Sequence, residues 1–273
     1  MASILPGVFK ATKKDGSIYY RSSFTHKSKH ISLGSFADPE SAHHAYLEAK
    51  QLLYNESETL ISLSDYRKDI HVLSFDKWVS LINLRDNGMY FATPIYIRKR
   101  YFQYYMSPSL ILKFDIDDLF YFASHKIMKR GGHYFVADFG MQVSILGRFG
   151  IKSYAVIGRD YDFINGDTTD FRRENLVIHN QYHGVLLQTD SKSSNTRFLA
   201  RIHVNGYYNI GIYDTMEQAA IAYNKAIDIL HKQGVGRNYV PNYLEHISPK
   251  TYADIYSSLK VSSKLYSISP SNQ

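Results

Sequence analysis

A module of about 45 residues occurs twice in this chain, once near each end. Gly7 and Tyr46 of the first copy match Gly184 and Tyr223 of the second, so both pairs give an offset of 177 (184 − 7 and 223 − 46). A slip of one residue is needed only around the middle of the module. Agreement over this length indicates a duplicated structural unit, and it requires one small fold to be built twice.

Each copy predicts three short strands followed by one helix. In the first copy the strand side chains alternate, with Tyr20 and Phe24 on one face and Arg21 on the other. Asp38 is a helix N-cap followed by proline, and Thr215 with Gln218 forms the capping box that opens the second helix. The small apolar residues of both helices recur at helical spacing; they are Ala42, Ala45, Tyr46 and Ala49, and Ala219, Ala222, Tyr223 and Ala226. We therefore expect these residues to pack on the sheet as core.

Composition limits the class of protein. A chain of 273 residues is long enough for two or three compact units, and 44% hydrophobic with 21% charged residues is typical of a folded protein. The absence of cysteine excludes disulfides and zinc–thiolate sites. We see no signal peptide and no apolar run of about 18 residues, which predicts a soluble cytoplasmic protein without a membrane partner. A net charge of +7 and 24 tyrosines favour a polyanion partner, although many soluble proteins are equally basic.

The repeated pattern, G-V-x followed by I-x-L-G-x-F/Y and E-x-A-x-x-A-Y-x-x-A, resembles the APETALA2-type DNA-binding domain. The resemblance covers residues 7–53 and, less tightly, 184–232. It implies that a three-stranded sheet enters the major groove of double-stranded DNA and contacts it through cations and aromatic residues. The outward-facing candidates are Lys10, Lys13, Lys14, Arg21, Lys27, Lys29 and His30 in the first copy, and Lys192, Arg197, Arg201 and His203 in the second. The alternative for each is a solvated charge on a strand edge.

A second motif lies between the repeats. Residues 160–176 read D-Y-D-F-I-N-G-D-T-T-D-F-R-R-E-N-L, which resembles the centre of HNH (ββα-metal) nucleases. The resemblance implies a metal-binding carboxylate at Asp162 and a general-base histidine next to it, where this chain has Phe163. Gly147 stands where the family has the histidine of L-H-R. A nuclease scaffold between two DNA-binding modules is similar to the homing endonucleases of phages and mobile elements.

The departures from the family pattern predict lost catalysis. Phenylalanine cannot accept a proton, and the asparagine expected after N-L is replaced by His183 or Gly184. Asp162 and His183 are the remnants, too few to predict a metal site. We therefore expect no cofactor, and Mg²⁺ or Mn²⁺ only if the chain is an active nuclease. His133, His179 and His183 are the histidines that could replace the base, and each is more typical of a hydrogen-bonding residue.

The charged residues of the motif have a structural interpretation. Asp167, Asp170, Arg172, Arg173 and Glu174 are expected to form a salt-linked loop and helix start, with Asn175 tying the turn. Arg172 and Arg173 are also candidates for phosphate contact. The dipeptide Asn165–Gly166 predicts the turn of a hairpin.

The predicted fold class is α+β, with two three-stranded-sheet-plus-helix modules flanking a ββα-metal-like domain. The predicted boundaries are 1–57 for the first module, 58–110 for a connecting region of mixed helix and strand, 111–183 for the nuclease-like domain, 184–240 for the second module and 241–273 for a C-terminal helix with a disordered tail. An entry strand with an acidic turn is expected at 111–118, a strand at 133–138, and helices at 75–83 and 249–259, while residues 143–149 stand where the HNH family has L-H-R. The stretch 95–105 is either a nucleic-acid surface or an aromatic core strand.

These observations favour a sequence-specific double-stranded DNA-binding protein, derived from an HNH homing endonuclease and acting by site occupancy, as a repressor or regulator of phage or mobile-element DNA in a bacterial cell. The alternative enzyme is a divergent HNH endonuclease that cleaves DNA with a divalent metal. A third interpretation is a protein-interaction module that reuses the old DNA surface.

Overall fold

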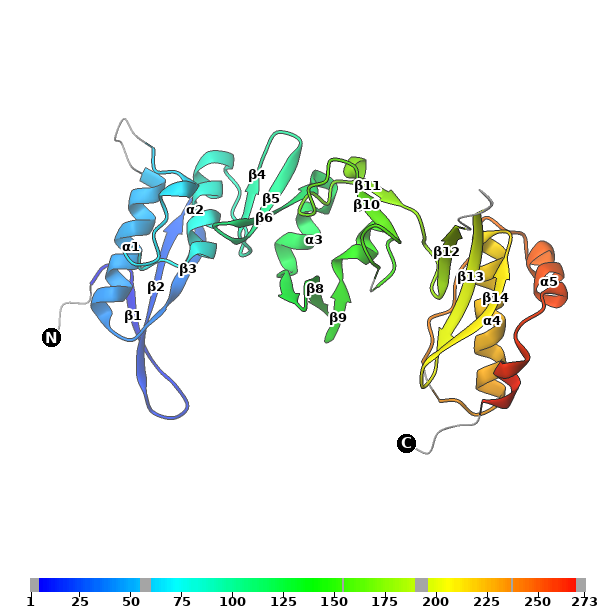
Figure 1. Ribbon diagram of the computed structural model, residues 1–273. Helices are drawn as coiled ribbons and strands as arrows, with labels where there is room; N and C mark the ends of the chain where they lie inside the picture. The colour runs from blue at the N-terminus through cyan, green and yellow to red at the C-terminus, as the bar shows by residue number, and fades with distance from the viewer. Residues whose placement is uncertain (1–4, 55–59, 154, 190–195, 237, 269–273) are drawn as a thin grey trace. The chain divides into compact units, whose positions relative to one another are not determined.

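The computed structural model describes residues 5–54, 60–153, 155–189, 196–236 and 238–268 (Figure 1). Within these ranges the chain forms four three-stranded antiparallel sheets, one two-stranded sheet and five α-helices, so the α+β class is confirmed. The chain divides into two compact units, Met1–Ile145 with Asp167–Asn175, and Leu146–Gly166 with Leu176–Gln273. In the described ranges no helix combines the length and the apolar character that crossing a membrane requires.

The first copy of the repeat folds as expected. Its elements are β1 (Val8–Thr12), β2 (Ile18–His26), β3 (Lys29–Phe36) and α1 (Pro39–Tyr54), and the strands pair in the order β1-β2-β3. Phe24, Ile31 and Leu33 are buried with the small residues of α1, Ala45 and Ala49. The sheet and the helix therefore share one core, and the opposite face of the sheet does not take part in it.

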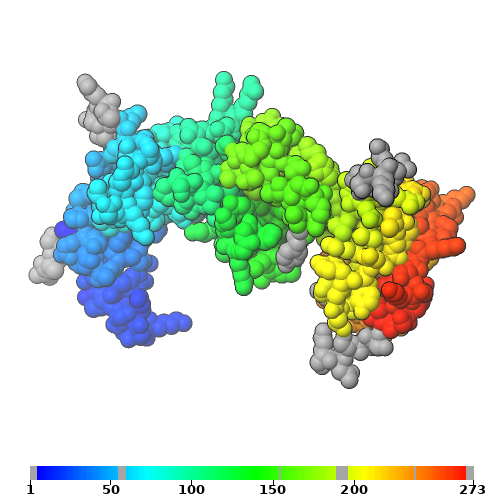
Figure 2. Space-filling view, in the orientation of Figure 1, coloured from blue at the N-terminus to red at the C-terminus, as the bar shows by residue number. Residues whose placement is uncertain are grey.

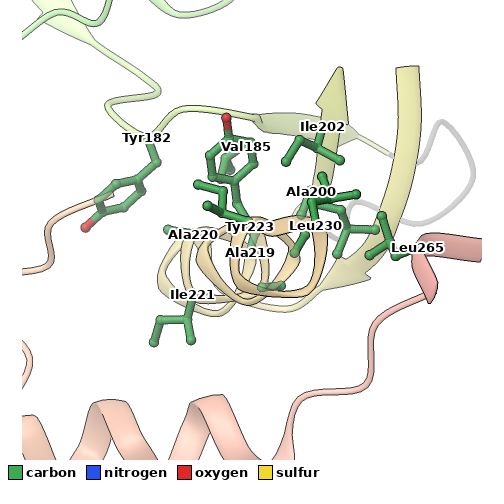
Figure 3. Packing of buried hydrophobic residues seen from close by; sticks show 14 of the residues in the cluster. Tyr182, Val185, Ala200, Ile202, Ala219, Ala220, Ile221, Tyr223, Leu230 and Leu265 are labelled. Atoms are coloured by element: carbon green, nitrogen blue, oxygen red, sulfur yellow. The ribbon is translucent and has the colours of Figure 1, made fainter. Parts of the chain in front are cut away.

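The second copy repeats this architecture with β12 (Val185–Thr189), β13 (Thr196–His203), β14 (Tyr207–Tyr213) and α4 (Met216–Lys232). The strand order β12-β13-β14 is the same. A β-bulge falls at matching positions, after Ser22 in β2 and after Ala200 in β13. Figure 3 shows Val185 and Ala200 between the strands and α4. The internal repeat of the sequence is therefore a structural repeat.

The one-residue slip in the alignment has a simple cause. Thr12 pairs with Ile18 across the first connection, whereas Thr189 pairs with Thr196, so this connection is one residue longer in the second copy. The second connection is one residue shorter, because the pair Thr25–His30 corresponds to His203–Tyr207. The insertion and the deletion cancel, which restores the offset of 177 (223 − 46) at the helix.

A glycine fixes the start of each module. Gly7 and Gly184 have φ of +77° and +69°, and a Cβ at either position would lie 2.2 Å from the ring of Tyr46 or Tyr223. The carbonyl of Gly7 accepts a hydrogen bond from Ser23 N–H (3.0 Å), and that of Gly184 accepts one from the backbone of the matching residue of β13 (2.7 Å). Each glycine thus combines a left-handed backbone with close approach of an aromatic ring.

The first unit continues with a helix and two further sheets. Its elements are η1 (Leu63–Asp65), α2 (Phe75–Asn87), β4 (Ile95–Ile97), β5 (Tyr101–Ser107), β6 (Leu110–Asp115), η2 (Ile116–Asp118), α3 (Leu119–Ser124), β7 (Met128–Arg130), β8 (His133–Asp138) and β9 (Met141–Ser144). The predicted helix at 75–83 and the strand at 133–138 are confirmed, and the segment 111–118 is β6 followed by a short 3₁₀ helix. Trp78 of α2 is buried against the core of the first module. The predicted division between 1–57 and 58–110 therefore crosses a shared core.

The open question about residues 95–105 is answered by burial. Phe102 and Tyr104 in β5 are 0% and 1% exposed, so this is an aromatic core strand. The cations of this segment lie in the turn before β5, where the backbone N–H of Arg98 donates to the carbonyl of Tyr101 at 2.9 Å. Burial raises the pKa of Tyr104 to about 12. The segment is thus core along the strand and basic at its turn.

The central motif departs from a ββα unit. β10 (Tyr161–Phe163) pairs with β11 (Leu176–Ile178), but the hairpin is closed by residues 164–175 and not by the predicted tight turn. Asn165–Gly166 does form a turn, in which Gly166 N–H donates to Phe163 O at 3.0 Å. The only helical piece in 164–175 is η4 (Arg173–Asn175), and no helix lies between β11 and β12, all of which are described residues. The helix start expected near Arg172 is only a short 3₁₀ turn. After β11 the chain continues to β12 of the second module without a helix.

The two compact units also divide the predicted domain 111–183, since Asp167–Asn175 belongs to the first unit and Leu146–Gly166 to the second. Most of the segment 143–149, which stands where the HNH family has L-H-R, forms the 3₁₀ helix η3 (Ile145–Phe149). Near the C-terminus, α5 (Pro249–Ser258) confirms the predicted helix. The predicted disordered tail is partly wrong, because η5 (Ser263–Ser267) buries Leu265 on α4, while 269–273 lies outside the described residues.

Candidate nucleic-acid interface

The outer face of the first sheet carries an exposed cation beside an exposed aromatic ring. Phe9, Arg21 and Ser35 lie in register across the three strands, on the side opposite to Val8 and Ser22. Phe9 is 52% exposed although phenylalanine is usually buried, and Arg21 is exposed. His30, which pairs with residue 25 beyond the bulge, is exposed as well. This face therefore offers hydrogen-bond donors and an aromatic surface to an outside partner.

Further cations lie at the two ends of this sheet. Lys13 and Lys14 are exposed in the β1–β2 connection, which projects from the first module (Figure 2). The connection is ordered by its own hydrogen bonds, since Lys13 N–H donates to Ser17 O at 2.9 Å and Asp15 accepts from Ser17. Those hydrogen bonds also lower the pKa of Asp15. Cationic side chains thus stand on a defined turn.

The β2–β3 turn places another cation at the opposite end. His26 pairs with Lys29, so Lys27 and Ser28 form a two-residue loop with φ of +43° and +65°. Positive φ at both positions is the geometry in which asparagine and glycine are preferred. A lysine and a serine hold this turn at a cost of roughly 1–2 kcal/mol per residue. This turn therefore carries an exposed lysine, Lys27, at its tip in spite of the backbone strain.

We expect Ser28→Gly to raise the free energy of unfolding by about 1 kcal/mol, because glycine adopts positive φ without steric cost. Trp78, the only tryptophan, is buried in the core of this unit, so urea denaturation followed by tryptophan fluorescence reports the effect. Ser32→Gly is the control: this exposed serine is in extended β3, where glycine should lower stability by about 0.5–1 kcal/mol. Equal effects of the two changes would contradict the strained turn.

Two of the predicted cations in the first copy are less available. Lys29 Nζ donates to Tyr90 O at 3.3 Å and lies 5.0 Å from the centre of the Tyr90 ring. Lys10 alternates to the side of Val8, so it is exposed but does not lie on the outer face as expected. Even so, residues 5–36 hold six lysines and arginines against one aspartate, Asp15, a net charge of +5 (6 − 1). Most of the chain's net charge of +7 therefore lies in this one segment.

The second sheet has a different outer face. Leu186, Leu199 and Ile212 lie in register across its strands, where the first sheet has Phe9, Arg21 and Ser35. Ile212 is 49% exposed. The position of Arg21 is thus taken by a leucine, and this face is apolar where the first is cationic.

The predicted cations of the second copy are engaged or lie elsewhere. Arg197 Nη2 donates to Asp214 at 3.0 Å, an exposed salt bridge, and Arg201 lies 4.2 Å from the centre of the Tyr207 ring. His203 is exposed and packs edge-on against the same tyrosine ring. Lys192 lies outside the described residues. The two modules therefore share a fold but not a surface.

In the nuclease-like motif, Asp162 and Phe163 lie on opposite faces of β10. Phe163 is 8% exposed and packs against Tyr161 with ring centres 5.6 Å apart, which fits the role of filling space in the core. Asp162 points the other way. Its Oδ1 accepts Gly158 N–H at 3.0 Å, and its Oδ2 accepts the Nε2–H of His179 at 2.9 Å. Both carboxylate oxygens are thus engaged by the protein.

The partner of Asp162 is His179 and not His183. β11 ends at Ile178, and His179 N–H donates to Asp160 O at 2.9 Å, which places the imidazole beside the carboxylate. His183 instead exchanges backbone hydrogen bonds with the side chain of Asn242 at 2.7 and 3.0 Å. Burial lowers the pKa of His183, with Lys152 adding to the effect.

The donor set for a metal ion is incomplete at this place. Asp162 and His179 are two donors, and among the described residues no group of three or more His, Cys, Asp or Glu side chains could hold a metal ion. Gly147, at the position of the family histidine, is exposed and would meet nothing within 4 Å if it carried a Cβ. The residues present therefore do not fit the metal that an HNH nuclease uses. His133 begins β8 in the other compact unit.

The charged loop of the motif is held together by its own ion pairs, as expected. Asp170 is fully buried and accepts from Arg172 Nε and Nη2 at 2.8 and 2.6 Å, and Glu174 accepts from Arg172 Nη1 at 2.7 Å. Asp167 pairs with Lys113 at 2.8 Å, and this hydrogen bond is the main reason that the pKa of Asp167 falls to about 2.

The remaining residues of this loop are also tied down. Arg173 N–H donates to Asp115 at 2.7 Å, and Asn175 Nδ2 donates to Asp170 O at 2.9 Å, so the asparagine ties the turn as predicted. Arg172 also lies 5.2 Å from the centre of the Tyr101 ring. The guanidinium of Arg172 is thus occupied inside the loop, whereas Arg173 is 53% exposed and pairs with buried Asp118 at 3.8 Å.

A buried ion cluster was missed from the sequence. Asp160 is fully buried and accepts from Lys152 Nζ at 3.0 Å and Arg159 Nη2 at 2.7 Å, while Lys152 also donates to Tyr182 O at 2.9 Å. Burial opposes ionisation of Asp160, but the donors from Arg159, Val156 N–H and Lys152 outweigh it and lower its pKa. Burial also lowers the pKa of Lys152. No signal in the sequence marks this cluster, since Lys152, Arg159 and Asp160 have the pattern of ordinary surface charges.

Compared with known proteins, the chain matches no protein-family model, no curated protein and no solved structure.

Proposed function

We propose that the chain binds double-stranded DNA through the outer face of its first sheet and acts by occupying its site rather than by cleaving it. The observation that carries the proposal is the concentration of charge on the β1–β3 segment, +5 (6 − 1) within residues 5–36, together with exposed Arg21 and Phe9 on one face. Lysine and arginine bind phosphates by releasing counterions, and a β-ribbon fits the major groove.

The dimensions of the sheet suit this role. β2 has nine residues, and a strand of this length spans roughly 30 Å. Lys13 and Lys14 mark one end of the sheet and Lys27 the other, so its cations are separated by a little less than one turn of B-DNA, about 34 Å. In this arrangement the turn lysines contact phosphates on either side of the groove, and Arg21 is placed to donate to base edges.

The central motif supports occupancy over cleavage. Phe163 is buried in the core, and both oxygens of Asp162 are engaged by Gly158 and His179. A repressor or regulator of phage or mobile-element DNA needs no more than binding at a defined sequence.

Titration of a genomic DNA library with the purified protein at several salt concentrations tests the proposal. We expect log K to fall linearly with log salt with a slope of about −4 or steeper, as roughly four to five phosphate contacts require. Footprinting should then show protection at a defined sequence. Absence of measurable DNA affinity would overturn the proposal and favour the protein-interaction alternative, for which the apolar row Leu186, Leu199 and Ile212 is the relevant surface.

One observation favours the second candidate, a divergent nuclease. His179 and Asp162 form a histidine–carboxylate pair at 2.9 Å, and their side chains are 38% and 44% exposed. A carboxylate that orients an accessible imidazole is the arrangement of a general base. Under the leading proposal the wild-type protein does not nick its cognate DNA with Mg²⁺ or Mn²⁺. Nicking that is lost in both Asp162→Asn and His179→Ala would establish the nuclease instead.

Restoring the family histidine by Phe163→His is expected to destabilise the protein without producing cleavage. The side chain at this position faces Tyr161 in the core and not Asp162, so the imidazole would be buried away from the carboxylate. We expect a loss of about 1–3 kcal/mol on replacing the buried ring, measured by thermal unfolding. Phe163→Leu is the matched control, which should cost less and be equally inactive. Cleavage gained by Phe163→His alone would contradict the orientation of β10.

A further inference from the structure

A pocket of about 590 Å³ lies in the first unit, between α2, the segment before it and the β4–β6 sheet. None of the cations proposed to contact DNA lines it, but Tyr96, Arg98 and Tyr105 belong to the stretch 95–105, for which a nucleic-acid surface was one of the two interpretations. Its volume is within the range of about 300–1,000 Å³ that is typical of small-molecule sites.

The walls of the pocket are apolar and aromatic. Phe75, Ile82, Tyr105 and Ile111 contribute to the lining. The rings of Phe75 and Tyr105 meet at 5.9 Å and 69°, so these walls support each other. Tyr105 is 5% exposed, and burial raises its pKa. Such a surface is suited to the flat face of a planar ring.

The rest of the lining is cationic. It includes three guanidinium groups, of Arg67, Arg85 and Arg98, and one carboxylate, of Asp86, a net charge of +2 (3 − 1). Asp86 is already occupied, because its Oδ1 accepts from Arg85 Nε at 2.6 Å and its Oδ2 from the Tyr96 hydroxyl at 3.0 Å. The pocket therefore holds an excess of positive charge.

Two of the three arginines can face a ligand. Arg85 is 14% exposed and donates to the carbonyls of Leu52 and Ile61, so its role is structural. Arg67 and Arg98 are exposed and, within the described residues, form no salt bridge. Arg67 Nη1 donates to the carbonyls of Ser64 and Tyr66 at 2.8 and 3.0 Å, so two hydrogen bonds to the backbone fix the position of this exposed guanidinium. Arg98 is held in place by stacking 4.5 Å from the centre of the Tyr96 ring and by donating Nε to Gln103 at 2.8 Å.

We propose that this pocket binds a nucleoside monophosphate, with the base against the aromatic wall of Phe75 and Tyr105 and the phosphate between Arg67 and Arg98. A planar guanidinium matches phosphate oxygens with two parallel hydrogen bonds, and a phosphate dianion satisfies the excess charge of +2 (3 − 1) in the lining. The combination of flat apolar walls and paired arginines selects a ligand that has both a ring and a phosphate. This ligand chemistry is shared by a free mononucleotide and by the phosphorylated end of a DNA strand. The inference does not depend on binding of duplex DNA by the first sheet.

Isothermal titration calorimetry of the full chain tests the proposal, with nucleoside 5′-monophosphates, the unphosphorylated nucleosides, inorganic phosphate and 5′-phosphorylated dinucleotides as probes. We expect saturable binding of at least one monophosphate, and binding weaker by about tenfold or more for both its nucleoside and inorganic phosphate. Tighter binding of the phosphorylated dinucleotide than of the mononucleotide would identify the end of a DNA strand as the ligand. Tighter binding of the mononucleotide would identify a free nucleotide.

Arg98→Ala and Arg67→Ala should each weaken the monophosphate by about tenfold or more. Lys99→Ala is the matched control, because this exposed cation is next to Arg98 in the same turn but does not line the pocket, and it should leave affinity unchanged. Circular dichroism establishes that each variant is folded. No binding of any monophosphate, equal binding of inorganic phosphate, or equal losses in all three variants would each overturn the proposal.

Discussion

Replacing Lys13, Lys14, Arg21 and Lys27 together by alanine is expected to lower the affinity for double-stranded DNA by about a hundredfold or more at low salt. These four side chains are exposed on the turns and the outer face of the first sheet. Each phosphate contact contributes about 0.9 to the slope of log K against log salt, so the loss of the three turn lysines Lys13, Lys14 and Lys27 reduces its magnitude by about 2.7. Fluorescence anisotropy over a range of salt concentrations measures both quantities.

A control with the same loss of charge separates contact from net charge. Lys68, Lys232, Lys250 and Lys264 are exposed lysines outside the first sheet, and their fourfold replacement by alanine also removes four positive charges. We expect this variant to keep most of the salt dependence and to lose less than about tenfold in affinity. Equal losses in both variants would mean that net charge, and not this sheet, determines binding.

The second large effect concerns the glycines that begin the modules. Gly7→Ala should lower the free energy of unfolding of the first unit by about 2–5 kcal/mol, the sum of a left-handed backbone in a residue with a Cβ and of overpacking against Tyr46. Gly184→Ala should have at least as large an effect in the second unit. Urea denaturation measures both, through Trp78 fluorescence for the first unit and circular dichroism for the second.

The two glycines differ in whether a second change can compensate. The three nearest atoms to a Cβ at Gly7 all belong to Tyr46, so Tyr46→Ala should reduce the additional cost of Gly7→Ala. A Cβ at Gly184 also meets the backbone oxygen of Arg201 at 2.5 Å, and Tyr223→Ala cannot relieve that contact. Gly206→Ala is the control, with nothing within 4 Å and no positive φ, and should be near neutral. Additive effects in both double variants would contradict this steric explanation.

Local patterns predicted the elements well where the signal was strong. The N-cap at Thr215, whose hydroxyl accepts from Gln218 N–H at 3.2 Å, and the small-residue stripe of α4 gave the helix and its buried face. The Asn165–Gly166 turn exists, but pairing of residues 161–163 with 176–178 is a longer-range choice that a dipeptide cannot determine. The helix expected in the central motif was predicted from the resemblance alone, because residues 160–176 contain no apolar stripe at helical spacing.

The candidate site was predicted by residue type but not by orientation. Arg21, Lys13 and Lys14 were expected to be exposed, and they are. Lys29 was not expected to rest on Tyr90, because the two are far apart in sequence. The same is true of the pairing of Asp162 with His179, which depends on the register of β10 and β11. Each of these differences arises from a contact between distant segments.

The sequence by itself determined that one module is built twice, since the spacing of Gly7 and Tyr46 recurs at Gly184 and Tyr223. Only the tertiary structure decided what each copy presents. The register of three strands places Arg21 on an exposed face in the first copy and Leu199 at the same place in the second. The residues of the two cores are constrained by the same close packing of helix on sheet, so their pattern recurs in the sequence. The residues of the outer face are constrained only by the partner that each sheet contacts.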